Sequence, residues 1–304
     1  MALTTIDGLD DRRVDVPARP LKALLRDDKA ALRAAPVALI FAEDSSEIAS
    51  TVHHHAALGF GLVCVFGQHP VAVHPSVADH VRAITLDLTD PHALAETVNA
   101  VAKTASGQWI YYGYNAEYLF FPFCDTRTVS DLVSFHSEER RDAMLCYVVD
   151  LYAGDLDQAP DAVSMTDTWL DRAGYYAHAR PDPARNGRPM ARQLDFFGGL
   201  RWRFEENLSR PERRIDRIAL FRANRSARLL PDHRFTVEEM NTYACGWHNN
   251  LTAAVVSFRM ARRLRTDPRT GADIHSFLWR NSAQFSWHPD QLLELGLMEP
   301  GQWF

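Results

Sequence analysis

Residues 36–67 read PVALIFAEDSSEIASTVHHHAALGFGLVCVFG, and this stretch decides the fold. Its apolar runs 36–42 and 61–67 each have the length of a buried strand. The segment 43–60 between them opens with acidic residues and ends at Gly59, as a helix does. Strand, helix and strand in this order predict a β-α-β unit, in which the two strands run parallel and the helix covers one face.

The same alternation continues along the chain. The expected elements are, in order, strand 81–88, helix 90–104, strand 108–114, helix 128–141 and strand 143–153. Asp90 is a suitable N-cap for the second helix, and Pro91 suits its first turn. The pattern predicts an α/β fold with a mainly parallel sheet flanked by helices, whose ligands bind at the carboxyl ends of the strands.

The second half of the chain is less regular. Residues 154–193 contain scattered Gly and Pro, which predicts a long irregular excursion of the kind that forms lids or binding loops. Shorter strand-like segments follow at 193–206, 214–223 and 229–235, and helices are expected at 250–266 and 288–298. We expect three regions: a lead with a short helix (1–35), an α/β domain (36–250) and a C-terminal helical extension (251–304).

Composition narrows the class of protein. The 304 residues carry a net charge of −6, which argues against a protein that mainly neutralises nucleic-acid phosphate. Apolar runs are too short to span a bilayer, and the first residues lack a secretory signal, so we expect a cytoplasmic protein without an integral membrane segment. The four cysteines have no metal-type spacing and are expected to be reduced.

Polar residues interrupt the strand-rich stretch WIYYGYNAEYLFFPF, residues 109–123. Asn115 and Glu117 follow the expected strand end at Tyr114, and Glu43 and Asp44 follow the first strand. Carboxyl ends of parallel strands meet at one edge of a sheet, where many α/β proteins hold a metal or a phosphate. The alternative is that 115–117 form only a tight turn and that the acids only stabilise a helix N-terminus.

Four stretches resemble the family-two-like glycosyltransferases with the GT-A fold, particularly a bacterial branch. They are residues 41–67, the stretch 109–123, LDFFGGLRWRF at 194–204, and the segments RIDRIALFRA, LLPDHRF and CGWHNNLTAAVVSFRMARR between 214 and 263. The resemblance runs from about Pro36 to Arg265. It implies transfer of a sugar from a nucleotide-sugar donor to a glycan, lipid-linked or protein acceptor, with inversion, as in polysaccharide biosynthesis.

The resemblance also implies roles for individual residues. Glu43, Asp44, Gln68 and Tyr114 would contact the nucleotide, and Asp195 would activate the acceptor, with Glu205, Glu238 and Glu239 as competing candidates. In the family, Mn²⁺ or Mg²⁺ held by an Asp-x-Asp motif neutralises the leaving diphosphate. Here Asn115, Glu117 and His248 would be the metal ligands.

The motif is degenerate at this position. Either Asn115 replaces one acid, or both aspartates are absent and only Glu117 remains. Metal binding is therefore expected to be weaker than in the family, or lost. The alternative function is a catalytically inactive or metal-independent GT-A descendant that acts as a binding or scaffold protein, with peripheral membrane association left open.

Overall fold

The computed structural model describes residues 12–241 and 250–303. The chain divides into two compact units, each built from several segments. Unit 1 comprises Met1–Tyr118, Phe123–Leu145 and Ile218–Asn241, and unit 2 comprises Leu119–Pro122, Cys146–Arg217 and Thr242–Phe304. The strands β8 (Glu117–Phe120), β9 (Ala143–Ala153) and β13 (Asp216–Arg222) contribute residues to both.

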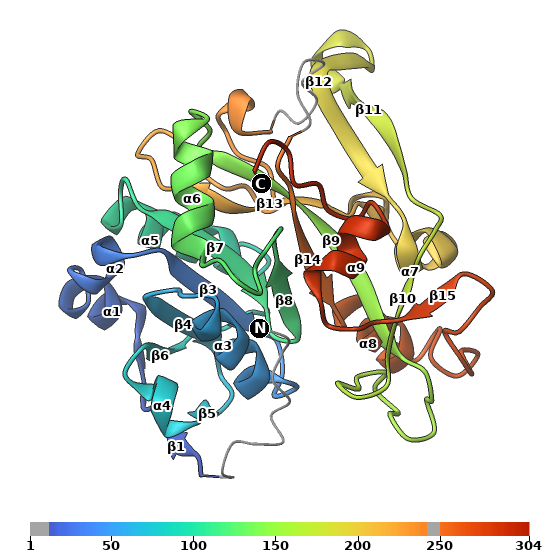
Figure 1. Ribbon diagram of the computed structural model, residues 1–304, viewed down its shortest axis with the longest axis horizontal. Coiled ribbons are helices and arrows are strands. Elements are labelled where there is room, and N and C mark those ends of the chain that lie inside the picture. Colours follow the sequence, from blue (N-terminus) through green and yellow to red (C-terminus); the bar gives the residue numbers. More distant parts are fainter. Residues whose placement is uncertain (1–11, 242–249, 304) are drawn as a thin grey trace. The chain divides into compact units, whose positions relative to one another are not determined.

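Unit 1 has the predicted strand-helix alternation (Figure 1). Its other elements are β1 (Val14–Asp15), β2 (Ala18–Pro20), α1 (Leu21–Asp27), α2 (Ala31–Ala34), β3 (Val37–Ala42), α3 (Ile48–Ala57), β4 (Leu62–Gly67), β5 (Ala72–Val73), α4 (Pro75–Ala78), β6 (Val81–Thr85), α5 (Ala93–Thr104), β7 (Trp109–Tyr114) and α6 (Val129–Glu138). A short 3₁₀ turn, Glu238–Asn241, ends its last segment. The mixed α/β class with a mostly parallel sheet is confirmed.

The sheet of unit 1 has the order β13-β7-β3-β4-β6-β2. All neighbours pair in parallel except β13, which runs antiparallel to β7. Every residue of β3 and β7 is buried, so both faces of the sheet are covered. The chain steps outward from β3 through β4 to β6 and then returns to place β7 on the other side of β3. The order of the strands therefore reverses between β3 and β7.

Neighbouring tyrosines of β7 show what covers each face. The Tyr111 ring stacks on His55 of α3, with ring centres 4.8 Å apart. The Tyr112 ring stacks on His233, at 5.7 Å. Because consecutive strand residues point to opposite faces, α3 covers one face and the segment around His233 covers the other.

Unit 2 is built around the later half of β9. β14 (Ala253–Ser257) pairs with β9 in parallel, β10 (Thr168–Asp171) pairs with it antiparallel, and β15 (Ser282–Gln284) continues beyond β10. The remaining elements are the hairpin β11 (Tyr176–Asp182) and β12 (Arg188–Phe197), the helices α7 (Gly199–Arg203), α8 (Arg259–Thr266) and α9 (Pro289–Glu294), and 3₁₀ turns at Pro183–Arg185, Glu205–Asn207 and Arg210–Arg213.

Three sequence predictions in this half are wrong. The segment 154–193 is not irregular, because it contains β10 and β11 and enters β12. Residues 250–266 are not one helix, since 253–257 form β14 before α8 begins. Residues 199–203 form α7, although the sequence predicted a strand over 193–206. The C-terminal region consequently contains strands as well as helices.

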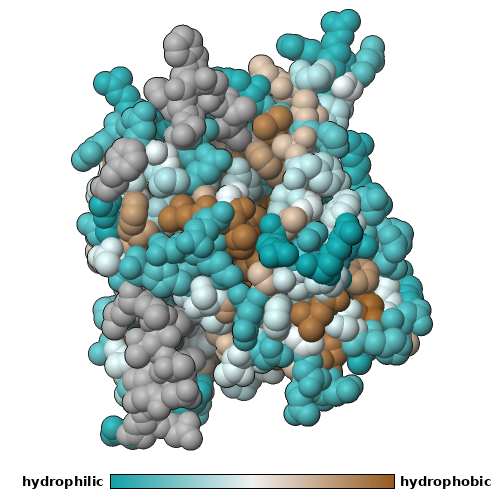
Figure 2. Space-filling model, turned by 45° about the vertical axis from the view of Figure 1, so that its right-hand side comes forward, coloured by the Kyte–Doolittle hydropathy of each residue, from teal (hydrophilic) through white to brown (hydrophobic). Residues whose placement is uncertain are grey.

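The surface is mainly hydrophilic on the face that Figure 2 shows, with apolar residues exposed in small patches. Among the described residues, the most exposed large apolar side chain is that of Leu278, at 41% accessibility. No helix in residues 12–241 or 250–303 combines the length and the apolar character needed to cross a bilayer.

Candidate functional site at the carboxyl edge of the unit 1 sheet

Segments that follow β3, β4 and β7 meet at the carboxyl edge of the sheet in unit 1. The Asn115 backbone N–H donates to the Phe41 carbonyl at 3.1 Å, which continues the pairing of β7 with β3. The His69 ring, in the loop after β4, lies with Nε2 3.3 Å from the Glu43 carbonyl oxygen. In a sheet of this topology, ligands bind where the strand order reverses, which is here between β3 and β7.

Asn115 holds the acidic turn in place. Its Oδ1 accepts from the Glu43 backbone N–H at 3.0 Å. Its Nδ2 donates to Asp44 Oδ1 and to the Ser46 carbonyl, both at 2.8 Å. The Asn115 side chain is fully buried, so the amide acts as a clamp between the two strand ends.

Glu117 also points inward. Its Oε2 accepts from the Tyr114 backbone N–H at 2.9 Å, and the residue is 1% exposed. Room for this carboxylate depends on Gly113, because a Cβ there would lie 3.1 Å from Glu117 Oε2 and 2.5 Å from the Tyr111 hydroxyl. Between the two polar residues, Ala116 has a left-handed φ of 55° and donates its N–H to Thr51 Oγ1 at 2.9 Å. Hydrogen bonds and close packing therefore hold residues 115–117 in one conformation.

The described residues of this turn do not fit a divalent cation. To bind Mn²⁺ or Mg²⁺, Asn115 and Glu117 would have to direct side-chain oxygens into a space that an ion can occupy. Asn115 and Glu117 are instead buried, and both have hydrogen bonds within the protein. No group of three or more His, Cys, Asp or Glu side chains suited to a metal occurs in the part of the chain that the structure describes. His248 lies outside the described residues.

The nucleotide candidates surround the turn. Glu43 and Gln68 are exposed, and Asp44 is half-buried, with Oδ1 also accepting from the Ser46 backbone N–H at 2.8 Å. Tyr114 is 9% exposed, and its ring lies edge-on to His233, with centres 6.4 Å apart. The edge thus combines carboxylate oxygens, an amide and an aromatic ring.

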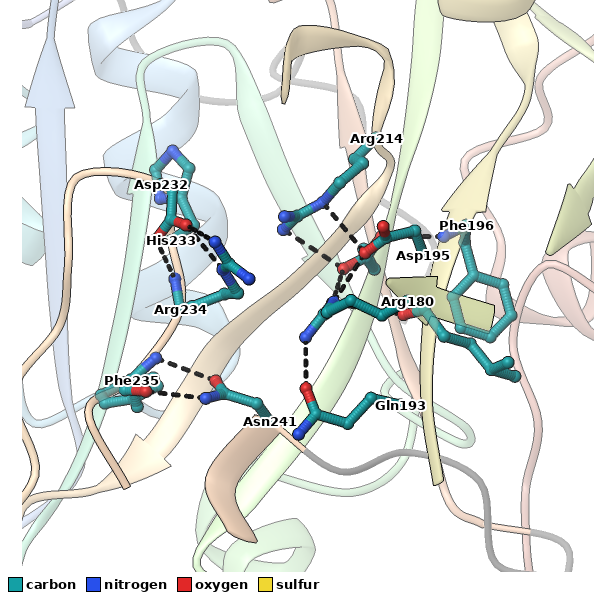
Figure 3. A network of polar contacts seen from close by, with 12 residues as sticks. Arg180, Gln193, Asp195, Phe196, Arg214, Asp232, His233, Arg234, Phe235 and Asn241 are labelled. Carbon is teal, nitrogen blue, oxygen red and sulfur yellow. Dashed lines mark hydrogen bonds and ion pairs between the residues drawn. The ribbon is translucent and has the colours of Figure 1, made fainter. Parts of the chain in front are cut away.

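His69 and His233 were not among the sequence candidates for this edge. His233 has a left-handed φ of 64°, and its Nδ1 lies 3.2 Å from the Tyr112 hydroxyl. Close to it, Arg234 pairs with Asp232, and Asn241 bonds both backbone groups of Phe235 (Figure 3). The sequence Asp232-His233-Arg234 was a local indication of a turn here, because Asp and His adopt positive φ more often than most residues do.

Asp195, the candidate base, belongs to an ion-pair network in unit 2 (Figure 3). Its Oδ1 accepts from Arg180 Nε at 2.7 Å. Arg180 is 1% exposed and also bonds Asp216 Oδ2 at 3.1 Å and Gln193 Oε1 at 2.8 Å. Arg214 reaches Asp216 at 3.3 Å, and burial raises the pKa of Asp216. Arg180 was not predicted from the sequence.

This network changes the interpretation of Asp195. Its Oδ1 is occupied by the hydrogen bond from Arg180 and also lies 3.8 Å from Arg214 Nε, so an acceptor hydroxyl would have to displace these contacts to reach that oxygen. The competing acids are more accessible: Glu205, Glu238 and Glu239 are all exposed. Glu205 lies 3.6 Å from Arg213.

Comparisons with known proteins add little to this structural description of the candidate site. No protein-family model matches the chain, and no curated protein matches it. Among solved structures, the chain is similar to TarS of S. aureus, with 14% sequence identity and a TM-score of 0.28. The match covers 38% of this chain and 22% of TarS. Likeness at this level carries no argument about function.

Proposed function

We propose that the chain is a glycosyltransferase and that unit 1 binds the nucleotide part of a nucleotide-sugar donor at the carboxyl edge of its sheet. The observation that supports this most is the position of the Asn115 clamp. It lies where the strand order reverses between β3 and β7, and it holds the turn that carries Glu43 and Asp44. That edge is where open α/β sheets bind nucleotides.

The residues at the edge suit the nucleoside. Ribose hydroxyls are donors, and the exposed Glu43 carboxylate is an acceptor for them. The Gln68 amide offers both a donor and an acceptor to a base. Tyr114, the last residue of β7, contributes an aromatic ring at the same edge of the sheet.

In this proposal the turn at 115–117 positions the nucleotide-binding residues and does not bind metal. Mn²⁺ or Mg²⁺ would offset the negative charge of the departing diphosphate, and no described residue is assigned to hold it. Nucleotide binding is therefore expected without added metal. The acceptor, which the resemblance suggests is a glycan, lipid-linked or protein substrate, is assigned no residues.

A binding protein without transferase activity is the second candidate. The pairing of Asp195 with Arg180 favours it, because the residue best placed in the sequence to act as base is held as a structural ion partner. Under this alternative, the nucleotide-sugar binds at the same edge and is released unchanged.

The test is thermal unfolding of the full chain with UDP-, GDP- and CDP-sugars, each in the presence of Mn²⁺ and of EDTA. A donor at about 100 times its Kd stabilises the folded protein by about 2.7 kcal/mol, so at least one should raise Tm in EDTA. Glu43→Gln should reduce that shift, whereas Glu138→Gln, an exposed acid on α6 that serves as the matched control, should leave it unchanged.

Product analysis separates the two candidates. Release of free nucleotide with an acceptor extract supports the transferase. A Tm shift without turnover under any acceptor supports the binding protein. If no nucleotide-sugar shifts Tm, or if Glu43→Gln and Glu138→Gln behave alike, the proposed site is refuted.

A further inference from the structure

A concave region lies at the opposite edge of the unit 1 sheet from the candidate nucleotide site. It is a hollow of about 1010 Å³, lined by residues of α1, α2 and α5, the connections around them and the loop after β13. Arg33 precedes the amino end of β3, and Lys103 and Thr104 precede the amino end of β7. Because the nucleotide edge is at the carboxyl ends of these parallel strands, the hollow is a different site.

The lining is strongly basic. Five cationic side chains line the hollow, against one carboxylate, that of Glu96; the cations are Lys29, Arg33, Lys103, Arg225 and Arg228. The whole chain has a net charge of −6, so this concentration of positive charge is not a consequence of overall composition. Like charges gathered around one hollow repel each other unless an anion lies among them.

These cations have few partners within the protein. The side chains of Lys29, Lys103, Arg225 and Arg228 form no hydrogen bond or ion pair with other described residues. Arg33 uses only Nε, which donates to the Thr104 carbonyl at 2.7 Å. Asp28, the nearest buried acid along the chain, pairs instead with Arg19 and Arg82.

The walls of the hollow are tied together by hydrogen bonds. Asn99 of α5 accepts from the Leu229 N–H at 2.8 Å and donates to the Leu229 carbonyl at 2.9 Å, which attaches the basic loop to the helix. Asn224 Oδ1 accepts from the Ser226 N–H at 2.7 Å and so forms a turn at the start of that loop. On the other side, Gln108 Nε2 donates to the Arg33 carbonyl at 3.2 Å.

This arrangement favours a particular kind of ligand. We propose that the hollow binds a small molecule with two or more linked phosphate groups. Guanidinium and ammonium groups from separate segments can each take a phosphate oxygen, and arginine does so with two parallel hydrogen bonds. The volume is at the upper end of small-molecule sites, which are about 300–1,000 Å³. The net charge of −6 favours such a ligand over a nucleic-acid strand.

The test uses isothermal titration of the full chain with orthophosphate, pyrophosphate and tripolyphosphate. Affinity should rise in that order and fall with added salt. Arg225→Ala combined with Arg228→Ala should weaken tripolyphosphate binding by roughly tenfold or more. The matched control is Arg188→Ala combined with Arg192→Ala, two exposed arginines of β12, which should leave the affinity unchanged.

Two further measurements make the result decisive. Glu43→Gln should leave tripolyphosphate binding intact, and the Arg225 and Arg228 double variant should keep its Tm shift with the nucleotide-sugar, so that the two sites fail independently. The proposal is overturned if tripolyphosphate does not bind, or if both arginine pairs affect it equally. Tighter binding of a short oligodeoxythymidylate than of tripolyphosphate would also overturn it, in favour of a nucleic-acid site.

Discussion

Replacing Asn115 by Asp tests the clamp most directly. The substitution keeps the size of the side chain and restores the acid that a metal-binding Asp-x-Asp motif would have. In this structure, however, the Asn115 nitrogen donates to Asp44 Oδ1 and to the Ser46 carbonyl, each at 2.8 Å. An introduced carboxylate oxygen would face both of these acceptors with no hydrogen to share, and one of them is itself a carboxylate.

The expected cost follows from these two contacts. Asp44 Oδ1 keeps the Ser46 N–H as a donor, so the main loss is at the Ser46 carbonyl; one acceptor left without its donor costs about 1–3 kcal/mol, and we expect about 2 kcal/mol. For a domain of this size, that lowers Tm by about 4–8 °C. Thermal unfolding followed by circular dichroism measures the difference from the wild type. The matched control is Asn224→Asp, because Asn224 uses its oxygen as acceptor and its nitrogen has no partner among the described residues.

The pH dependence of the variant's stability is a second test of the Asn115→Asp prediction. Burial beside Asp44 should raise the folded-state pKa of the introduced carboxyl above its unfolded value of about 3.9. The destabilisation is then absent below that unfolded value and grows as pH rises toward the folded pKa. Relative to the wild type, the deficit in Tm should be larger at pH 8 than at pH 5. A variant within about 2 °C of the wild type, or one stabilised only by Mn²⁺, would refute the clamp and support a metal turn.

Three other predictions concern the buried charges and thiols. Arg180→Met removes one of the two arginines that pair with the buried Asp216, and Arg214 remains, so the free energy of unfolding in urea titrations should fall by about 1.5–3 kcal/mol; a loss below about 0.5 kcal/mol would contradict the network. Burial lowers the pKa of His136 to about 4, so stability should fall as pH drops from about 6.5 toward 4. His136→Gln should make that acid limb less steep, while His55, whose pKa burial also lowers to about 4, keeps its own contribution; an unchanged pH profile would argue against a buried neutral His136. Burial raises the pKa of Cys64 to about 12, so iodoacetamide should modify the half-buried Cys124 first, as peptide mass mapping would show; equal rates would contradict this.

The first half of the fold follows from local patterns that a sequence displays. β3 and β4 are continuous apolar runs, and β9 spans 143–153 as expected, because strands buried on both faces leave little room for polar residues. The amphipathic helices between them have recognisable starts, such as the capping box of Thr128 and Asp131 on α6. These signals need no knowledge of distant contacts.

The second half depends on contacts that local patterns do not record. Residues 253–257 can continue into α8 as a helix, and they form β14 because they pair with Cys146–Asp150 of β9. The hairpin β11–β12 did have a local signal: Asn186 and Gly187 both have positive φ, as an Asn-Gly turn requires. The Arg180 network could not be predicted, since its partners come from positions up to 36 residues away.

The candidate edge illustrates why residue type alone was an incomplete guide. The sequence placed Glu43, Asp44, Gln68, Tyr114 and Asn115 at the ends of neighbouring strands. It could not show that both the oxygen and the nitrogen of the Asn115 amide form hydrogen bonds within the protein. Only an amide satisfies both neighbours, because it accepts from the Glu43 N–H and donates to the Asp44 carboxylate, whereas an aspartate could do only the first. The residue that weakens the expected metal motif therefore also fixes the acidic turn, and for this reason the proposed nucleotide site assigns no cation to the clamp.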